Sequence, residues 1–376
     1  MKILIGILRW FVGILFIFSG LIKANDPVGL SYKMQEFFEI WGWHALNDYT
    51  LFFSITMIAF EIIAGVAVII GWQFRLFSML LFLLIVFFTF LTGYAVFSGK
   101  VRECGCFGDC IKLTAMESFI KDIILFIMIS ILLVKKNQVK SWLKPVKATA
   151  ALLATTVLSI WVQFYVLDHL PIIDCLPFKV GNNINEGMQI PPGSTPDSTV
   201  INFVYQHKGK EVEFDAEHFP ADFNDSAYTF LRRYDKLIRE GNAKPPIKDF
   251  VIIAPSGTDT TQAILNDDKD QLILFARTLE TDESAWVTEI RKIAQVLGTE
   301  GFFVVTSDAE NMQEILKKNG IGLPVMKGDL VSIKTAARTN PTLFHLRQGQ
   351  ILAKYGRKDF GKFLTRINDI EGSGKN

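Results

Sequence analysis

Four cysteines carry the most distinctive chemistry in this sequence, and three of them fall within seven positions. The segment Glu103-Cys104-Gly105-Cys106-Phe107-Gly108-Asp109-Cys110 includes two glycines, which let the backbone turn tightly. Thiols this close together can exchange disulfides, form structural bridges or bind a metal ion. We therefore take as candidate catalytic residues all four cysteines of the chain, Cys104, Cys106, Cys110 and Cys175.

Three interpretations of the cysteines stay open on spacing alone. A redox relay would use one pair as an exchange couple and the other as its acceptor. Two structural bridges are the alternative, with Cys106 paired to Cys110 and Cys104 to Cys175 as one of the three pairings that four cysteines allow. Each disulfide requires that the Cα atoms of its two cysteines lie within about 7 Å of each other. Zinc is the third possibility, although C-x-C-x3-C is an unusual spacing for its ligands.

Five apolar segments in the first 170 residues are predicted to position these cysteines. Roughly 20 helical residues cross about 30 Å of hydrocarbon, and each segment approaches that length. The fourth is short, and Thr and Ser dilute the fifth. No small-x-small cleavage site follows the first, so we expect a retained span rather than a signal peptide. The five predicted spans are Ile3–Ile22, Leu51–Trp72, Leu76–Phe97, Phe119–Val134 and Ala148–Leu167.

The distribution of lysine and arginine predicts how these spans are oriented. The connection between spans four and five has five lysines between positions 135 and 147 and no acidic residue, so we expect it to be cytoplasmic. The N-terminus is then cytoplasmic as well. The loop with Cys104, Cys106 and Cys110, and everything from Asp168 onward, face the opposite, oxidising side. Unbound thiols are oxidised there, which argues against a metal site.

The overall composition excludes several classes of function. Lys+Arg number 39 and Asp+Glu number 38, a balance that argues against binding to nucleic acid. The five histidines are scattered without ligand spacing, so we predict no metal ligands among them. The sequence contains no Walker loop, dinucleotide fingerprint, HExxH motif or nucleophile elbow.

From about Thr199 the pattern changes to short strands and amphipathic helices, which predicts a mixed sheet covered by helices. Val200–Tyr205 and Glu211–Phe214 alternate around a turn and suggest a hairpin. Tyr228–Arg239 has helical spacing. Further strands are expected at Phe250–Ala254, Gln271–Thr278, Phe302–Thr306, Thr342–Leu346 and Gln350–Tyr355.

This order of elements resembles the thioredoxin-like fold. Asn340-Pro341-Thr342, followed by an apolar strand and the turn at Gln348-Gly349-Gln350, is similar to the family's X-Pro-Thr strand, in which the proline is cis. The resemblance implies an active-site pair of cysteines after the strand Gln271–Thr278. The sequence there is Leu279-Glu280-Thr281-Asp282-Glu283-Ser284-Ala285-Trp286, without cysteine. A domain of this kind would have lost its own dithiol.

Three motifs of the membrane part form a recognisable set. They are Arg9…Gly13 with Ser19-Gly20-Leu21-Ile22-Lys23 in the first span, Glu61, Gly65, Gly71 and Arg75 in and after the second, and Cys104-Gly105-Cys106-Phe107-Gly108 in the loop. The first two are similar to the opening and second patterns of the DoxX/MauE family of four-helix membrane bundles, and the third looks like the CGCFG stretch of its MauE branch. The resemblance covers about 135 residues. It implies quinone-coupled sulfur oxidation or disulfide maturation of periplasmic enzymes.

Two ionisable residues, Arg9 and Glu61, fall inside predicted spans, where an unpaired charge costs several kcal/mol. We expect both to face the bundle interior and to form an ion pair. They are our candidate cofactor-binding residues, beside a quinone head group or on a proton path. The alternative is a pair that only fixes helix register. Lys121 and Asp122 are expected at the outer end of span four, where snorkelling suffices.

Two functions follow from these observations. In the first, the chain is a membrane thiol-disulfide oxidoreductase that exchanges disulfides with a periplasmic partner and passes electrons to a membrane acceptor, a quinone. Arg102 and Lys112 are the cations nearest the thiols. In the second, it is a non-enzymatic scaffold or accessory subunit of a larger cell-envelope complex, with structural disulfides. The expected partners are periplasmic or envelope proteins and membrane lipid, not nucleic acid.

The predicted fold is a membrane α-helical bundle followed by an α/β thioredoxin-like soluble domain. Residues 1–136 form the DoxX/MauE-like four-helix bundle, and residues 137–170 form a cytoplasmic basic loop and a fifth span. Residues 171–198 are a periplasmic linker, and residues 199–376 form the periplasmic domain that lacks CxxC. The expected location is the bacterial inner membrane.

Overall fold

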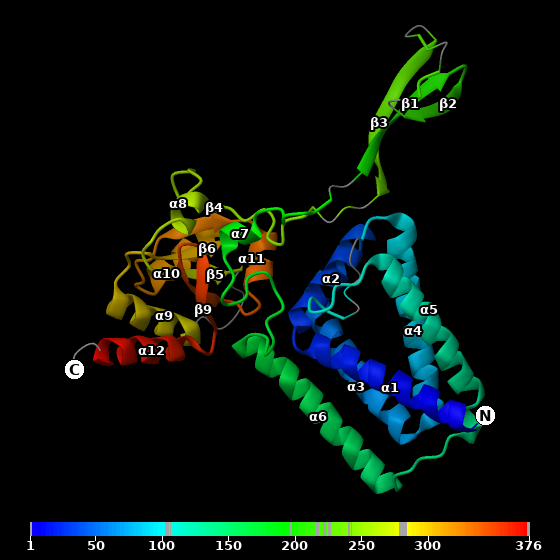
Figure 1. The fold of residues 1–376 in the computed structure, drawn as a ribbon. Coiled ribbons are helices and arrows are strands. Elements are labelled where there is room, and N and C mark those ends of the chain that lie inside the picture. The colour runs from blue at the N-terminus through cyan, green and yellow to red at the C-terminus, as the bar shows by residue number, and fades with distance from the viewer. Residues whose placement is uncertain are drawn as a thin grey trace.

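The N-terminal part of the chain is a set of helices. The computed structural model describes residues 2–101, 105, 107–195, 198–215, 218–220, 223–224, 227–239, 241, 243–277 and 284–373. In Figure 1, α1, α3, α4 and α5 form a helical bundle, α2 lies at one end of it, and α6 extends toward the C-terminal part. The helices are α1 (Lys2–Ala24), α2 (Pro27–Ile40), the 3-10 helix η1 (His44–Tyr49), α3 (Thr50–Ile70), α4 (Phe74–Ser98), α5 (Ala115–Val134), the 3-10 helix η2 (Lys136–Gln138) and α6 (Pro145–His169).

Four of these segments are long and apolar enough to cross a membrane. They are Ile3–Ala24, His44–Ile70, Phe74–Ser98 and Pro145–His169, close to four of the five predicted spans. Small residues let α1 and α3 pack with their backbones in contact, as is common between membrane helices. A Cβ added at Gly65 would lie 2.7 Å from the carbonyl oxygen of Gly13.

Helix α5 differs from these four because it carries Glu117, Lys121 and Asp122. A capping box between Thr114 and Glu117 fixes its first turn. Asp122 lies on the face of α5 that packs against α4 and is fully buried. The expectation that snorkelling brings Asp122 to the membrane surface is therefore wrong. That α5 crosses the membrane stays a prediction.

The C-terminal part is built on a six-stranded sheet of order β4-β7-β6-β5-β8-β9. Strands β5, β6 and β7 are parallel, whereas β8 is antiparallel to β5 and β9 to β8. The strands are β4 (Ile252–Ile253), β5 (Gln271–Ala276), β6 (Phe302–Thr306), β7 (Val325–Gly328), β8 (Thr342–Arg347) and β9 (Gln350–Gly356). The helices of this part are α7 (Ile184–Gly187), α8 (Thr261–Leu265), α9 (Ser284–Leu297), α10 (Ala309–Lys318), α11 (Leu330–Ala336) and α12 (Phe360–Ser373).

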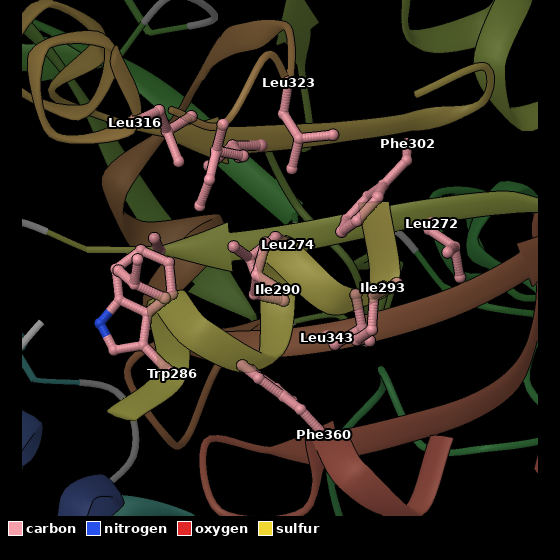
Figure 2. Packing of buried hydrophobic residues seen from close by; sticks show 14 of the residues in the cluster. Leu272, Leu274, Trp286, Ile290, Ile293, Phe302, Leu316, Leu323, Leu343 and Phe360 are labelled. Atoms are coloured by element: carbon pink, nitrogen blue, oxygen red, sulfur yellow. The ribbon is translucent and has the colours of Figure 1, made fainter. Parts of the chain in front are cut away.

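Two apolar clusters cover the two faces of this sheet, and we call the resulting unit the α/β domain. On one face Leu274 and Leu343 pack against Trp286 and Ile290 of α9 and against Phe360 of α12 (Figure 2). The other face is covered by α11 and by the segment that follows α6. Every residue of β5 and β6 is buried, which explains why both strands read as continuous apolar runs.

The segment expected to be a linker, residues 171–198, contributes to that second face. Phe178 and Ile184 are buried in its apolar cluster. The backbone N–H of Gly181 donates to the carbonyl of Ile351, and that of Ile184 to Gly349. The first two-thirds of residues 171–198 are therefore packed on the α/β domain. The polar residues that suggested a free linker form turns along the surface of this domain.

A separate three-stranded sheet of order β2-β1-β3 projects away from both parts (Figure 1). Its strands are β1 (Ser198–His207), β2 (Lys210–Asp215) and β3 (Tyr228–Arg239). The predicted β1–β2 hairpin is confirmed. The helical interpretation of Tyr228–Arg239 is wrong because this segment pairs with the whole length of β1. Its Tyr, Thr and Phe residues at the start also favour a strand.

Candidate functional site

The bundle encloses a cavity of about 400 Å³ that is lined by α1, α2, α3, α4, α5 and the segment before α5. We call this space the bundle cavity and residues 104–110 the cysteine loop. Gly105 and Phe107, the neighbours of Cys106, line the cavity. Most of the remaining lining is aromatic or aliphatic. The polar side chains in its wall are Ser19, Lys23, Lys33, Thr56, Thr92, Lys121 and Asp122.

The first polar group of the cavity joins α1 to α3. Lys23 Nζ lies 2.6 Å from Glu61 Oε1, and both side chains are almost fully buried. Ser19 Oγ donates to Glu61 Oε2 at 3.2 Å. The Lys23 ammonium also lies 5.1 Å from the ring centre of Phe88, which lines the cavity. Burying the charges of Lys23 and Glu61 without these partners would be costly. Their ion pair and the Ser19 hydrogen bond therefore stabilise both charges inside the bundle.

The second polar group joins α4 to α5 near the cysteine loop. Lys121 Nζ lies 2.6 Å from Asp122 Oδ1, and Thr92 Oγ1 donates to Asp122 Oδ2 at 3.1 Å. The Lys121 ammonium is 5.2 Å from the ring centre of Phe107. This cation therefore links the loop to the buried carboxylate.

The predicted ion pair between Arg9 and Glu61 is wrong. Arg9 Nε donates to the carbonyl of Ile69 at 3.1 Å, at the far end of α3. Helices α1 and α3 run antiparallel, so Glu61 lies opposite Lys23 instead. Arg9 and Lys23 are about 20 Å apart along α1, at a rise of 1.5 Å per residue. Arg9 does not line the bundle cavity.

Cys110 and Cys175 form a disulfide with Cα atoms 4.9 Å apart. Cys175 therefore reaches the loop as expected, but the pairing of Cys106 with Cys110 and of Cys104 with Cys175 is wrong. Cys104, Cys106 and Arg102 lie outside the described residues. Among the side chains that the structure describes, no group of three or more His, Cys, Asp or Glu residues could hold a metal ion.

Arg338 of the α/β domain binds the bundle beside this disulfide. Its Nη2 lies 2.7 Å from Asp109 Oδ2, and its Nε lies 2.8 Å from Asp26 Oδ2 at the start of α2. Its third nitrogen donates to the carbonyl of Lys334. Burial would lower the pKa of Arg338, but the two carboxylates outweigh burial and raise it. Burial raises the pKa of Asp26, although Arg338 opposes this shift.

Tyr32 of α2 is the centre of the same interface. Its hydroxyl accepts from Arg277, which follows β5, and its ring faces three cations of the α/β domain. The Lys334 ammonium lies 5.0 Å from the ring centre, and the Arg338 and Arg277 guanidinium carbons lie at 5.6 and 5.8 Å. Burial raises the pKa of the Tyr32 hydroxyl.

The end of the α/β domain that meets α2 carries the Asn340-Pro341 segment. Its peptide bond is cis, as the resemblance implied. The backbone N–H of Arg277 donates to Asn340 Oδ1 at 2.8 Å, which ties the end of β5 to this segment. Residues 278–283, most of the stretch in which the missing dithiol was expected, lie outside the described part of the chain.

The sequence did not single out the residues that build these contacts. Lys23 stood in the motif of the first predicted span but was not expected to pair with Glu61. Asp109 was visible beside Cys110, but Arg338 is 229 residues away. Only its position two residues before Asn340 connects Arg338 to a recognised motif.

Comparison with known proteins gives a match for the bundle and none for the α/β domain. Residues 1–135 match the family described as Methylamine utilisation protein MauE. Residues 199–240, which include the three-stranded sheet, match a domain of unknown function, DUF8463. No curated protein matches the chain, and no solved structure matches it. The match and the apolar helices together support a membrane location for an N-terminal region that is similar to MauE.

Proposed function

We propose that the chain supports thiol-disulfide redox chemistry at the membrane, with the cysteine loop as exchange couple and a quinone as electron acceptor. One observation carries this proposal: Gly105 and Phe107, on either side of Cys106, line the bundle cavity. A thiol in this loop would thus lie next to a space inside the bundle. A partner protein with a dithiol would meet the loop from the other side.

The bundle cavity has the chemistry that a quinone ring requires. Its volume, about 400 Å³, lies within the usual range for ligand sites, and it is mainly apolar with a few polar groups. Ser19, Lys23, Thr92 and Lys121 could donate hydrogen bonds to carbonyl oxygens. When bound, the quinone would accept two electrons and two protons. Oxidation of two thiols to a disulfide releases the same number, so the reaction balances.

The disulfide supports the predicted orientation of the chain. Cys110 precedes α5 and Cys175 follows α6, so an even number of membrane crossings must separate them. Helix α6 is long and apolar enough to be one crossing, which makes α5 the other. We infer that both cysteines and the α/β domain lie on the oxidising, periplasmic side of an inner membrane. The lysines of the α5–α6 connection and the N-terminus would then be cytoplasmic.

We further propose that the α/β domain is a thioredoxin-like domain without its dithiol. Strands β9, β8, β5 and β6 adjoin in that order, β5 and β6 are parallel, and a cis proline precedes β8. These features support the resemblance. Such a domain would dock the partner protein and hold the cysteine loop through Arg338.

The proposal is tested by alkylating the cysteines in native membranes before and after respiration is blocked, with peptide mass shifts as the readout. We expect Cys104 and Cys106 to become reduced when the acceptor is lost. A Cys106→Ser strain should also lose disulfides in the partner protein, whereas Cys175→Ser should retain partner oxidation in part. Cysteines that stay fully oxidised under both conditions would contradict the redox proposal.

The alternative is a non-enzymatic scaffold or accessory subunit of an envelope complex. The Cys110–Cys175 disulfide favours it, because this bond joins the bundle to the segment that leads into the α/β domain. If the chain is recovered in a stable stoichiometric assembly that keeps its activity after all four cysteines are replaced, the scaffold explains the observations better.

A further inference from the structure

Asp122 is a carboxylate buried inside the bundle, two turns from the start of α5. Its side chain is fully buried. Carboxylates at such positions are costly and are commonly functional. Thr92 donates a hydrogen bond to Oδ2. Oδ1 lies 2.6 Å from Lys121 Nζ as an ion pair but has no hydrogen-bond partner among the described residues. Asp122 and both partners line the bundle cavity.

The partners of Asp122 connect the cavity to the loop end of the bundle. The Lys121 side chain is 23% exposed, whereas Asp122 is fully buried, so Lys121 is the member of the pair that reaches the surface of the bundle. One turn earlier on α5, Ser118 is fully buried, and its hydroxyl has no hydrogen-bond partner among the described residues. Thr114, Ser118 and Asp122 recur every four residues and therefore lie along one face of the helix. This face provides polar groups from the exposed end of α5 to the cavity.

Glu61, the other fully buried carboxylate among the described residues of the bundle, differs in this respect. Glu61 is fully buried, and its partner Lys23 is only 4% exposed. Neither member of that pair reaches water. The Lys23–Glu61 pair can therefore bind and orient, whereas the Lys121–Asp122 pair can also exchange protons with the outside.

We propose that Asp122 carries protons into the bundle cavity, an inference that rests on the proposed function. Lys121 Nζ gives a proton to Asp122 Oδ1. Rotation of the neutral carboxyl group then brings this proton to the Thr92 hydroxyl oxygen, and the Thr92 hydroxyl releases its own proton toward the cavity. Lys121 then regains its proton from water. Two such transfers supply the two protons that a quinone consumes when a dithiol of the loop gives up two electrons. The two protons that the thiols lose pass to the water outside the bundle, so the overall proton balance is unchanged. The other charged groups of the cavity wall are Lys23 and Lys33.

The test uses the full-length protein in lipid nanodiscs, with decylubiquinone as the probe. Asp122→Asn keeps the size of the side chain and its hydrogen bond to Thr92 but cannot carry a proton. After the cysteines are reduced, quinol formation should slow about 100-fold, the usual effect of losing a general acid. Binding of decylubiquinone should stay unchanged. Quenching of Trp41 fluorescence measures it, since Trp41 lines the cavity, and Trp41→Phe identifies the signal.

Three further measurements keep the inference falsifiable. Glu61→Gln is the matched variant of the other buried pair and should weaken decylubiquinone binding, while quinol formation at saturating decylubiquinone should slow far less than in Asp122→Asn. If Asp122→Asn does not fold, Thr92→Val removes only the last hydrogen bond of the path and should also slow quinol formation. Infrared difference spectra recorded on chemical reduction of bound decylubiquinone should contain a carboxyl band that Asp122→Asn lacks.

The outcomes separate this inference from the proposed function. Quinol formation at the wild-type rate in Asp122→Asn, or an infrared spectrum without the carboxyl band, overturns the role of Asp122. If the wild-type cysteines never reduce bound decylubiquinone, the proposed function fails, and the infrared band still reports whether Asp122 exchanges protons with the cavity.

Discussion

Replacement of Arg338 by glutamine should release the α/β domain from the bundle. The Arg338 side chain is 6% exposed and bridges Asp26 and Asp109, which are 12% and 31% exposed. Glutamine leaves both carboxylates in the interface without a cation. It also removes the donor to the carbonyl of Lys334, at the end of α11.

The magnitude follows from the burial of the two carboxylates. Removing one member of a buried ion pair costs about 3–5 kcal/mol. Asp109 is nearly one-third exposed and can be hydrated in the variant, so the lower end of that range applies. A loss of about 3 kcal/mol corresponds to a roughly 100-fold larger population of the undocked state, at 1.4 kcal/mol per factor of ten.

Hydrogen–deuterium exchange of the protein in nanodiscs measures this population. Amides of α2 and of the Asp109–Lys112 segment should exchange about 100-fold faster in Arg338→Gln, whereas β5 and β6 should be unaffected. Arg338→Lys should give an intermediate result, since one ammonium cannot reproduce the fork of a guanidinium. Arg347→Gln is the control, because Arg347 pairs with Asp270 on the exposed surface of the domain. Unchanged exchange in α2 of Arg338→Gln would refute the assigned role of this ion pair.

Three more predictions concern the same contacts and the bundle. In Arg338→Gln the pKa of Asp26 should rise further, because the cation that opposes the effect of burial is gone. Docking of the α/β domain should then weaken as pH rises through this pKa, because the buried carboxyl group becomes charged. Adding Asp26→Asn should abolish the pH dependence of amide exchange. Gly65→Ala places its Cβ 2.7 Å from a carbonyl oxygen of α1 and should cost about 1–3 kcal/mol in a thermal unfolding assay, while Gly6→Ala, in open space, should be silent. Cys175→Ser opens a loop of 65 residues and should cost at most about 4 kcal/mol, measured by protease sensitivity of the α/β domain; full protection would contradict this.

The helices and the central strands could be predicted because their signal is local. Apolar runs longer than about 18 residues identify α1, α3, α4 and α6. Short apolar runs between polar turns identify β5, β6, β8 and β9. The prediction failed at Tyr228–Arg239, where the apolar spacing is compatible with a helix and pairing with β1 decides for a strand.

Partners of charged residues could not be predicted, because they depend on the register between helices. Arg9 and Glu61 looked like a pair since both lie inside spans. The antiparallel packing of α1 on α3 places Lys23 against Glu61, and the sequence does not contain that register. The ion pairs of Arg338 could not be predicted for the same reason, since its partners are more than 200 residues away in the sequence.

The docking of the α/β domain depends on polar contacts and on one covalent bond rather than on a shared apolar core. Among the described residues, each large apolar cluster lies within either the bundle or the α/β domain. The contacts between the helices and the α/β domain include Arg338 with its two carboxylates and Tyr32 with Arg277. Lys334 also donates to Gln35, and at the end of α6 Asp168 pairs with Arg357 and Lys358.

Polar interfaces of this kind favour relative motion of domains, and ion pairs at their margins weaken with salt. The Cys110–Cys175 disulfide opposes that motion because it keeps the partners at a high effective concentration. Arg338→Gln should therefore have a larger effect in a Cys175→Ser background than in the oxidised protein. Since Asp109 is adjacent to Cys110, the ion pair and the disulfide hold the same end of the cysteine loop. Reduction of this disulfide would leave Arg338 as the main contact that keeps the loop against the α/β domain.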